Sequence, residues 1–331
     1  MKFSVIIPVY NCADKLHISV DSILNQTFRD FELILVNDGS KDNSLKICQK
    51  YADKDSRIVV IDQSNLGPGA ARNNAIKAAK GDYLVFCDAD DCISPEALEC
   101  AETYFRTNDW DIMFFGYSDV IIHLDQLTEI GKHVSDYKEY HSNQKFKSDY
   151  DALDNLAFTY PVWNKAYRRD FVIKNGAMFP IETNVAEDFI FNIQLYRKAE
   201  NVLVSDKCFY MYIHHSNSIT STFNVDKLLG IEYVYQFALK LFMDWNPMMV
   251  NKVKNSYIRD LSVFINNMYN KNVSLKLSEK RRIVKKIVHM ESVQECLKNV
   301  NCISFRNKII AFLLKCKMTD ALLLTGRIAR L

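Results

Sequence analysis

Two aspartates one position apart, Asp88 and Asp90, directly follow a predicted strand at Asp82–Cys87. Carboxylates this close repel one another unless a cation lies between them. Mg²⁺ and Mn²⁺ take one or two such carboxylates and complete their shell with phosphate oxygens. The pair therefore predicts a divalent metal site for a phosphorylated ligand. The alternative is a turn in which Asp90 or Asp91 caps the next helix, although Ser94 already predicts that cap.

Three other side chains stand where a nucleotide could bind. Tyr10 offers a flat face to a base, and Asp38 can accept the imino proton of a uracil ring. Arg72, on a predicted helix, could neutralise phosphates together with a metal. The alternatives are a packing role for Tyr10 and an exposed helical position for Arg72. The first strand is not followed by G-x-G-x-x-G, and the chain has no P-loop, which excludes those two phosphate-binding modes.

The first hundred residues alternate between apolar, β-branched runs and helical patterns. Strands are predicted at Phe3–Val9, Phe31–Val36, Arg57–Asp62 and Asp82–Cys87, and helices at Ala13–Phe28, Asp42–Ala52 and Pro68–Ala79. This alternation predicts an α/β fold with right-handed βαβ units and a mostly parallel sheet. The carboxyl ends of such strands meet at one edge, where ligands bind. The polar residues that follow the strands are therefore expected at that edge.

The rest of the chain is less regular. The pattern predicts a helix opening at Ser94, a strand at Asp111–Tyr117, a polar insertion or hairpin at 118–150, a helix at Val185–Lys198 and a strand at Val202–Ile213. After Asp226 it is helical, with one further strand considered near Ile303. We predict a catalytic domain at 1–225, with a nucleotide-binding half at about 1–117 and an acceptor half at about 118–225, and a basic helical region at 226–331.

The composition is that of a globular protein, because 48% of the 331 residues are hydrophobic and 25% are charged. This excludes a disordered chain and a disulfide-stapled scaffold. Nine cysteines without a C-x-x-C pair indicate reduced thiols in a cytosolic protein, and we expect no signal peptide and no membrane span. Residues 1–225 carry a net charge of −9 and residues 226–331 one of +11, which predicts two regions with different partners.

Five motifs occur in order along the chain. They are Val5-Ile6-Ile7-Pro8-Val9-Tyr10-Asn11, Ser22-Ile23-Leu24-Asn25-Gln26-Thr27, Val36-Asn37-Asp38-Gly39-Ser40, Gly69-Ala70-Ala71-Arg72-Asn73 and Asp88-Ala89-Asp90-Asp91. Together they resemble a family 2 glycosyltransferase of the GT-A fold, over roughly residues 1–220. The resemblance implies an inverting enzyme with a nucleotide-sugar donor and Mg²⁺ or Mn²⁺ on the D-x-D residues. It also implies that Pro8, Tyr10, Asp38, Arg72, Asp88 and Ala89 line the donor pocket.

An inverting transfer needs a carboxylate that takes the proton of the acceptor hydroxyl. The candidates are Glu187 and Asp188. With Asn184 as N-cap, Glu187 falls at the third helical position and completes a capping box, so Asp188 has no such structural role. The alternative is that both acids merely favour the helix dipole. The family resemblance also makes the Asp of such a pair the base. We predict Asp188, provided that it faces the metal site and is not buried in a salt bridge.

Four more residues are assigned by the same resemblance. Trp163 and Lys165 resemble the family's W-N-K stretch on the donor or acceptor side, and Glu187 is placed there too. The alternative is a core tryptophan beside a solvated lysine. His215 resembles a family histidine near the metal, although Ile213 stands where the family often has an arginine, and a surface histidine is the alternative reading.

Residues 271–331 alone carry a net charge of +10, with apolar patches at Ile309–Leu314 and Ala321–Leu324. Such a region could bind the anionic inner face of the plasma membrane or be a solvated helical appendage. Nucleic acid is not expected, since no aromatic residues interleave with the basic cluster. The family resemblance, together with this basic region, implies that the acceptor is a glycan or lipid-linked glycan of a surface polysaccharide. The alternatives are a nucleotidyltransferase making nucleotide-sugars, which would need a Gly-rich loop after the first strand, and a non-catalytic binding subunit.

Overall fold

The computed structural model describes residues 2–123, 126–214 and 223–328. The chain forms two compact units, Met1–His215 and Ser216–Leu331. The sequence analysis placed the corresponding boundary after residue 225. Each unit has its own buried apolar core, so each is described by itself.

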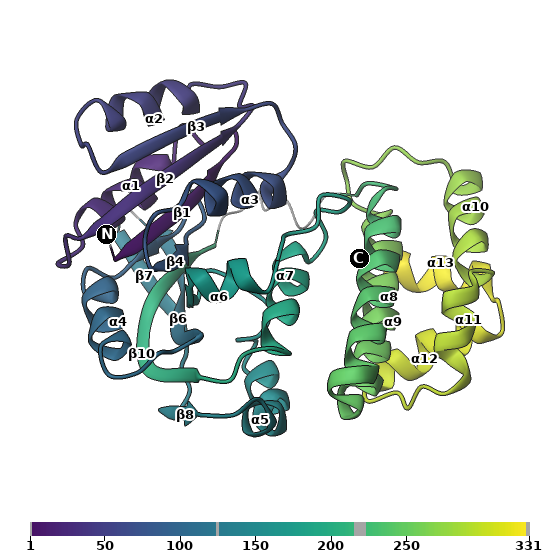
Figure 1. The fold of residues 1–331 in the computed structure, drawn as a ribbon. Helices are drawn as coiled ribbons and strands as arrows, with labels where there is room; N and C mark the ends of the chain where they lie inside the picture. Colours follow the sequence, from purple (N-terminus) through teal and green to yellow (C-terminus); the bar gives the residue numbers. More distant parts are fainter. Residues whose placement is uncertain (1, 124–125, 215–222, 329–331) are drawn as a thin grey trace. The chain divides into compact units, whose positions relative to one another are not determined.

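The first half of the N-terminal unit is a parallel sheet (Figure 1). Its strands are β1 (Phe3–Val9), β2 (Phe31–Asp38), β3 (Ile58–Gln63) and β4 (Tyr83–Phe86), in the order β3-β2-β1-β4. The helices α1 (Leu16–Leu24), α2 (Ser44–Ala52) and α3 (Pro68–Ala78) connect them. Every residue of β2 is buried, as expected of a strand covered on both faces. The α/β fold predicted from the alternation is confirmed.

The second half extends the same sheet with mostly antiparallel pairs. Its strands are β5 (Cys92–Ile93), β6 (Ile112–His123), β7 (Gln126–His133), β8 (Lys138–Tyr140), β9 (Lys165–Arg168) and β10 (Val202–Ile213). The order continues from β4 as β9-β6-β10-β5; β7 pairs with β6, and β8 with β10. The polar segment 118–150 therefore contains a hairpin, β6–β7, followed by β8 and a helix. The complete sheet is mixed: strands β1 to β4 pair in parallel with one another, as do β6 and β10.

Four helices belong to this second half: α4 (Ala97–Phe105), α5 (Asn143–Asn155), α6 (Arg169–Lys174) and α7 (Glu187–Tyr196). The helix predicted to open at Ser94 begins instead at Ala97, and Ser94 is not its N-cap. The reason is the neighbouring strand, because the Ser94 N–H donates to the carbonyl of Phe209 in β10 at 2.8 Å. That bond holds Ser94 in line with β5, so the chain can turn into the helix only afterwards.

The described part of the C-terminal unit is helical. Its elements are α8 (Lys227–Trp245), the 3₁₀ turn η2 (Pro247–Met249), α9 (Val250–Asn267), α10 (Leu277–Val288), α11 (Glu291–Lys298), α12 (Phe305–Lys315) and α13 (Thr319–Ile328). Figure 1 shows α8 and α9 side by side, and the two helices pack together. The strand considered near Ile303 is absent from residues 223–328. None of the described helices combines the length and hydropathy needed to cross a bilayer.

Candidate active site

The loop after β4 turns one of its three aspartates inward and two outward. Asp91 is 1% exposed; its carboxylate accepts the hydroxyl of Tyr210 at 2.6 Å and the N–H of Ile213 at 2.7 Å. Burial, together with the negative charge of Asp88, raises the pKa of Asp91 well above its usual value. The side chains of Asp88 and Asp90 are 32% and 41% exposed. Asp91 therefore anchors the loop to β10, and neither it nor Asp90 caps the next helix.

These two outward carboxylates fit a hard divalent ion. Oxygen ligands are what Mg²⁺ and Mn²⁺ prefer, and a donor set of one or two carboxylates is usual where phosphate oxygens complete the shell. No group of three or more His, Cys, Asp or Glu residues that could hold a metal is found in the part of the chain that the structure describes. A metal here would thus depend on the bound ligand for the rest of its shell. His215, the third predicted ligand, lies outside the described residues.

Arg72 joins this loop to the start of α7. Its guanidinium is buried and lies 2.9 Å from Asp88 Oδ1, 3.3 Å from Glu187 Oε1 and 3.2 Å from Asp188 Oδ1. The exposed helical position considered for Arg72 is therefore wrong. For Arg72 to reach the two acids of α7, α3 must lie close to the segment that precedes α7. Gly69 permits this, because a Cβ at that position would lie 2.6 Å from the carbonyl oxygen of Pro180. Asp88 and the adjacent acids Glu187 and Asp188, which lie far from it in the sequence, are thus gathered around one cation.

The helix that carries Asp188 begins later than predicted. α7 starts at Glu187, after Ala186 in the left-handed conformation with φ of +50°. Asn184 is therefore not the N-cap, Glu187 is the first helical residue, and the expected capping box does not form. Both acids at this helix start pair with Arg72, so the ion pairs replace the cap that the sequence suggested.

Asp188 is a carboxylate in a largely dehydrated place. Its Oδ2 accepts the N–H of Val162 at 3.2 Å, whereas its buried Oδ1 has no hydrogen-bond partner among the described residues. Burial raises the pKa of Asp188 to about 7; Arg72 opposes this rise, and the negative charges of Glu187 and Asp88 add to it. The prediction of Asp188 as the base required that its carboxylate not be buried in a salt bridge, and the structure meets this requirement only in part. Asp188 forms an ion pair with Arg72 through its buried Oδ1, which counts against a base, but its side chain is still 20% exposed.

Asp38 lies at the carboxyl end of β2, as predicted, but its oxygens are already occupied. Oδ1 accepts the N–H of Leu66 at 2.8 Å and Oδ2 that of Gly67 at 2.9 Å, and Gln63 donates to Oδ1 as well. Asp38 is also only 3% exposed. It therefore holds the loop between β3 and α3 in place, and three of the roughly four acceptor positions of its carboxylate are already used.

The remaining donor-side positions lie at the same edge of the sheet. Pro8 is near the end of β1, which pairs with β4, and Ala89 lies in the loop after β4. Tyr10, just beyond β1, is 47% exposed, so its ring is accessible to a ligand and does not pack in the core. Because β1, β2 and β4 are parallel, the predicted donor-binding residues at their carboxyl ends lie at the same edge of the sheet.

Trp163 and Lys165 have different surroundings. The ring of Trp163 stacks on Tyr210 with centroids 4.3 Å apart, beside the loop that Tyr210 anchors through Asp91. Lys165 is fully buried, and its ammonium donates to the carbonyls of Phe158 and Pro161 and to the side chain of Asn164. The prediction that Lys165 faces the donor or acceptor is therefore wrong, because its side chain is buried. The alternative of a solvated lysine is wrong for the same reason.

The sequence analysis missed a cluster on the second half of the sheet. Asp119 on β6 binds His133 on β7 through Oδ2 at 2.7 Å and His214, just after β10, through Oδ1 at 2.8 Å. Burial opposes ionisation of Asp119, but the hydrogen bonds from both histidines lower its pKa overall. No local motif marks these residues; only the pairing of β6 with β7 and β10 brings them together.

The fold and the site define a class of protein. A parallel βαβ half that ends in two outward aspartates, continued by a mixed half, is the GT-A arrangement, and the structure agrees with that of a GT-A enzyme. Staphylococcus aureus TarS (residues 1–349) in complex with UDP-GlcNAc superposes with a TM-score of 0.67 at 20% identity, covering 100% of this chain and 92% of the other. This likeness concerns the fold.

The family follows from the sequence comparisons. The model of glycosyl transferase family 2 matches residues 4–176, and the chain belongs to that family. Two Bacillus subtilis proteins whose names describe glycosyltransferases are similar to it. EpsJ is 34% identical over 221 residues, or 66% of this chain and 62% of EpsJ. EpsH is 30% identical over 327 residues, or 95% of this chain and 91% of EpsH.

TarS of S. aureus is also a sequence relative. It is named a poly(ribitol-phosphate) beta-N-acetylglucosaminyltransferase and is 31% identical over 215 residues, which are 63% of this chain and 35% of TarS. The chain thus spans less than two thirds of EpsJ and about a third of TarS.

Proposed function

We propose that this chain transfers a sugar, with inversion, from a UDP-sugar to a glycan or lipid-linked glycan in the synthesis of a bacterial surface polysaccharide. The observation that carries the proposal is the cluster around Arg72, which sets Asp188 beside the D-x-D loop. UDP is favoured because the relative TarS has been obtained with UDP-GlcNAc, and because TarS and the Eps proteins are bacterial glycosyltransferases by name. A hexosyl or N-acetylhexosaminyl group is the corresponding donor sugar.

Asp88 and Asp90 would hold Mg²⁺ or Mn²⁺ against the donor diphosphate. When bound, such an ion stabilises the charge that develops on the leaving diphosphate. Arg72 supplies a second, fixed positive charge beside Asp88. Pro8, Tyr10 and Ala89 line the nucleotide's side of the pocket, and Trp163 and Glu187 stand on the acceptor or donor side.

Asp188 acts as the general base. Its carboxylate, which is 20% exposed at the side-chain level, takes the proton of the acceptor hydroxyl. At the same time the hydroxyl oxygen forms its bond to the anomeric carbon, and the bond to the diphosphate breaks. A carboxylate with a pKa of about 7 is well matched to this task near neutral pH, because a base works best when its pKa is close to the working pH. Attack opposite the leaving group inverts the anomeric centre.

Release of UDP from a panel of UDP-sugars, with Mn²⁺, with Mg²⁺ and with a chelator, tests this proposal. We expect metal-dependent release that Asp90→Asn reduces by at least about a hundredfold. Asp109→Asn is the matched control, since Asp109 is exposed and precedes β6, at the opposite edge of the sheet from the site. Release of pyrophosphate from a nucleoside triphosphate and a sugar phosphate would instead identify a nucleotidyltransferase. Donor binding without any turnover would identify a binding subunit.

We also propose that the protein is cytoplasmic and binds the inner face of the plasma membrane through α12. Phe305, Ile309 and Phe312 recur at helical spacing on this helix, and all three are exposed. The helix contains no acidic residue, and its basic residues are Arg306, Lys308 and Lys315. Exposed apolar side chains flanked by cations are typical of helices that lie in an anionic membrane interface.

Sedimentation with vesicles tests this surface. We expect the protein to bind phosphatidylglycerol vesicles at low salt and to dissociate at high salt, because each cation near such a surface contributes about 1 kcal/mol. Replacing both Phe305 and Phe312 by Ser should abolish the binding, whereas Met248→Ser, at another exposed apolar position, should leave it unchanged. Equal partitioning into phosphatidylcholine vesicles would contradict an electrostatic membrane surface.

A further inference from the structure

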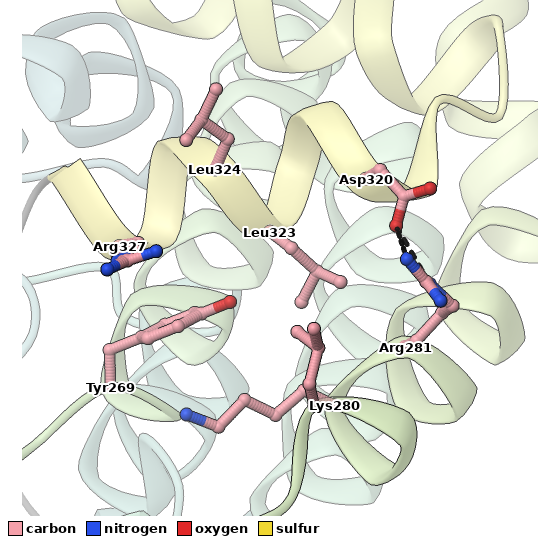
Figure 2. Close-up of a pocket in the computed structure, with 8 residues that line it drawn as sticks. Tyr269, Lys280, Arg281, Asp320, Leu323, Leu324 and Arg327 are labelled. Carbon is pink, nitrogen blue, oxygen red and sulfur yellow. Dashed lines mark hydrogen bonds and ion pairs between the residues drawn. The ribbon is translucent and has the colours of Figure 1, made fainter.

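The C-terminal unit contains a pocket of about 420 Å³ between the end of α9, α10 and α13 (Figure 2). Its walls mix apolar and basic residues: Tyr269, Leu277, Lys280, Arg281, Asp320, Leu323, Leu324 and Arg327. This volume lies within the range of about 300–1,000 Å³ that is usual for small-molecule sites. The three cations and one carboxylate leave the walls with a net positive charge.

Lys280 is the unusual member of this pocket. Its side chain is nine-tenths buried, and among the described residues no carboxylate lies within ion-pair distance of its ammonium. Instead, that ammonium lies over the ring of Tyr269, 3.9 Å from the centroid. Burial lowers the pKa of Lys280. The stem of Lys280 is thus covered by protein, while its ammonium lines the pocket without a carboxylate partner among the described residues.

The other charges do not neutralise Lys280. Figure 2 shows Asp320 paired with Arg281 at the opposite end of the pocket from the Lys280 ammonium, with Leu323 between them. The distance from Arg281 Nη2 to Asp320 Oδ1 is 2.7 Å, so this carboxylate is already engaged. Arg327 has no ion-pair partner within residues 223–328. Two cations, Lys280 and Arg327, are therefore available to an anion that enters from solvent.

We propose that this pocket binds an amphiphilic phosphate, that is, a phosphate or diphosphate group on an apolar chain. The anionic group pairs with Lys280 and Arg327, and the chain packs on the leucines, of which Leu277 and Leu324 are more than half exposed without a ligand. A free phosphate would leave those leucines uncovered, and a neutral lipid would leave Lys280 unpaired. The ligand class goes beyond the proposed sugar transfer and does not depend on it.

Titration calorimetry with the full chain tests the proposal with water-soluble probes. We expect dihexanoyl phosphatidic acid or farnesyl phosphate to bind at least about tenfold more tightly than inorganic phosphate, because only they bury the leucines. Tighter binding of phosphatidic acid would identify the ligand as a membrane phospholipid, and tighter binding of farnesyl phosphate would identify it as an isoprenoid phosphate. Inorganic phosphate binding as tightly as both, or no binding of either, would overturn the proposal.

Lys280→Met separates a ligand-binding role from a structural one. Without ligand we expect the variant to melt within about 2 °C of wild type, since methionine keeps the apolar contacts of the stem and the ammonium it removes has no carboxylate partner among the described residues. Its affinity for the preferred probe should fall by about tenfold or more, the usual effect of losing a charge-assisted contact. Lys286→Met, at an exposed position on the same helix, should change neither value. A lower melting temperature with unchanged affinity would show that Lys280 only supports the fold.

Discussion

Asp188→Asn should lower kcat by roughly a thousandfold while leaving donor affinity within a few-fold of wild type. The amide keeps the shape of the side chain but cannot accept the acceptor proton, and general-base catalysis contributes about 10² to 10⁴ in rate. The measurement is steady-state UDP release with the donor that the panel identifies. Asp109→Asn is the matched control, because it makes the same change at an exposed position at the opposite edge of the sheet.

The pH dependence gives this prediction a second readout. With the pKa of Asp188 at about 7, kcat/KM of the wild type should fall as the pH drops through 7, and the Asn variant should lack that limb. The same pKa is raised above the unfolded value, so the folded state binds the extra proton, and wild-type stability declines as the pH rises from about 4 to 7. The Asn variant should therefore gain melting temperature relative to wild type across that window. A variant with near-normal kcat would move the base elsewhere.

Arg72→Met should destabilise the N-terminal unit by about 3 to 5 kcal/mol, the usual cost of removing one partner from a buried ionic cluster. Asp88, Glu187 and Asp188 would then face one another without the cation that now lies between them. The penalty arises only when the acids are ionised, so the loss of melting temperature should be larger at pH 8 than at pH 5. Thermal unfolding at the two pH values measures it.

Activity should change in the same variant for a related reason. Arg72 holds down the pKa of Asp188, so its removal should move the acid limb of kcat/KM to a pH above 7. Arg106→Met is the control for loss of an arginine at the surface, where an exposed pair contributes little; its side chain is 74% exposed. An Arg72→Met protein as stable as wild type at pH 8 would mean that the three acids are not coupled through this cation.

Sequence reasoning located most of the N-terminal half but misplaced element starts near the site. The strands β1, β2 and β4 were predictable because strands buried on both faces appear as continuous apolar runs, whereas β3 is only partly buried and was predicted from its β-branched residues. The starts of α4 and α7 were not, because contacts with distant residues fix them. A bond to Phe209 delays α4, and Arg72 binds the acids that open α7. Capping preferences are local, and each contributes only about 1 kcal/mol, so such contacts override them.

By itself the sequence determined the family, the α/β order of elements and the candidate acids, since motifs and hydrophobic periodicity are properties of neighbouring residues. The tertiary structure decided which of those acids lie close together. It buried Asp91 against Tyr210, left Asp88 and Asp90 partly exposed, and placed Arg72 between Asp88 and Asp188. It also buried Lys165 and Lys280 without carboxylate partners among the described residues. Charge environments depend on distance and dehydration in space, which spacing along a chain does not encode.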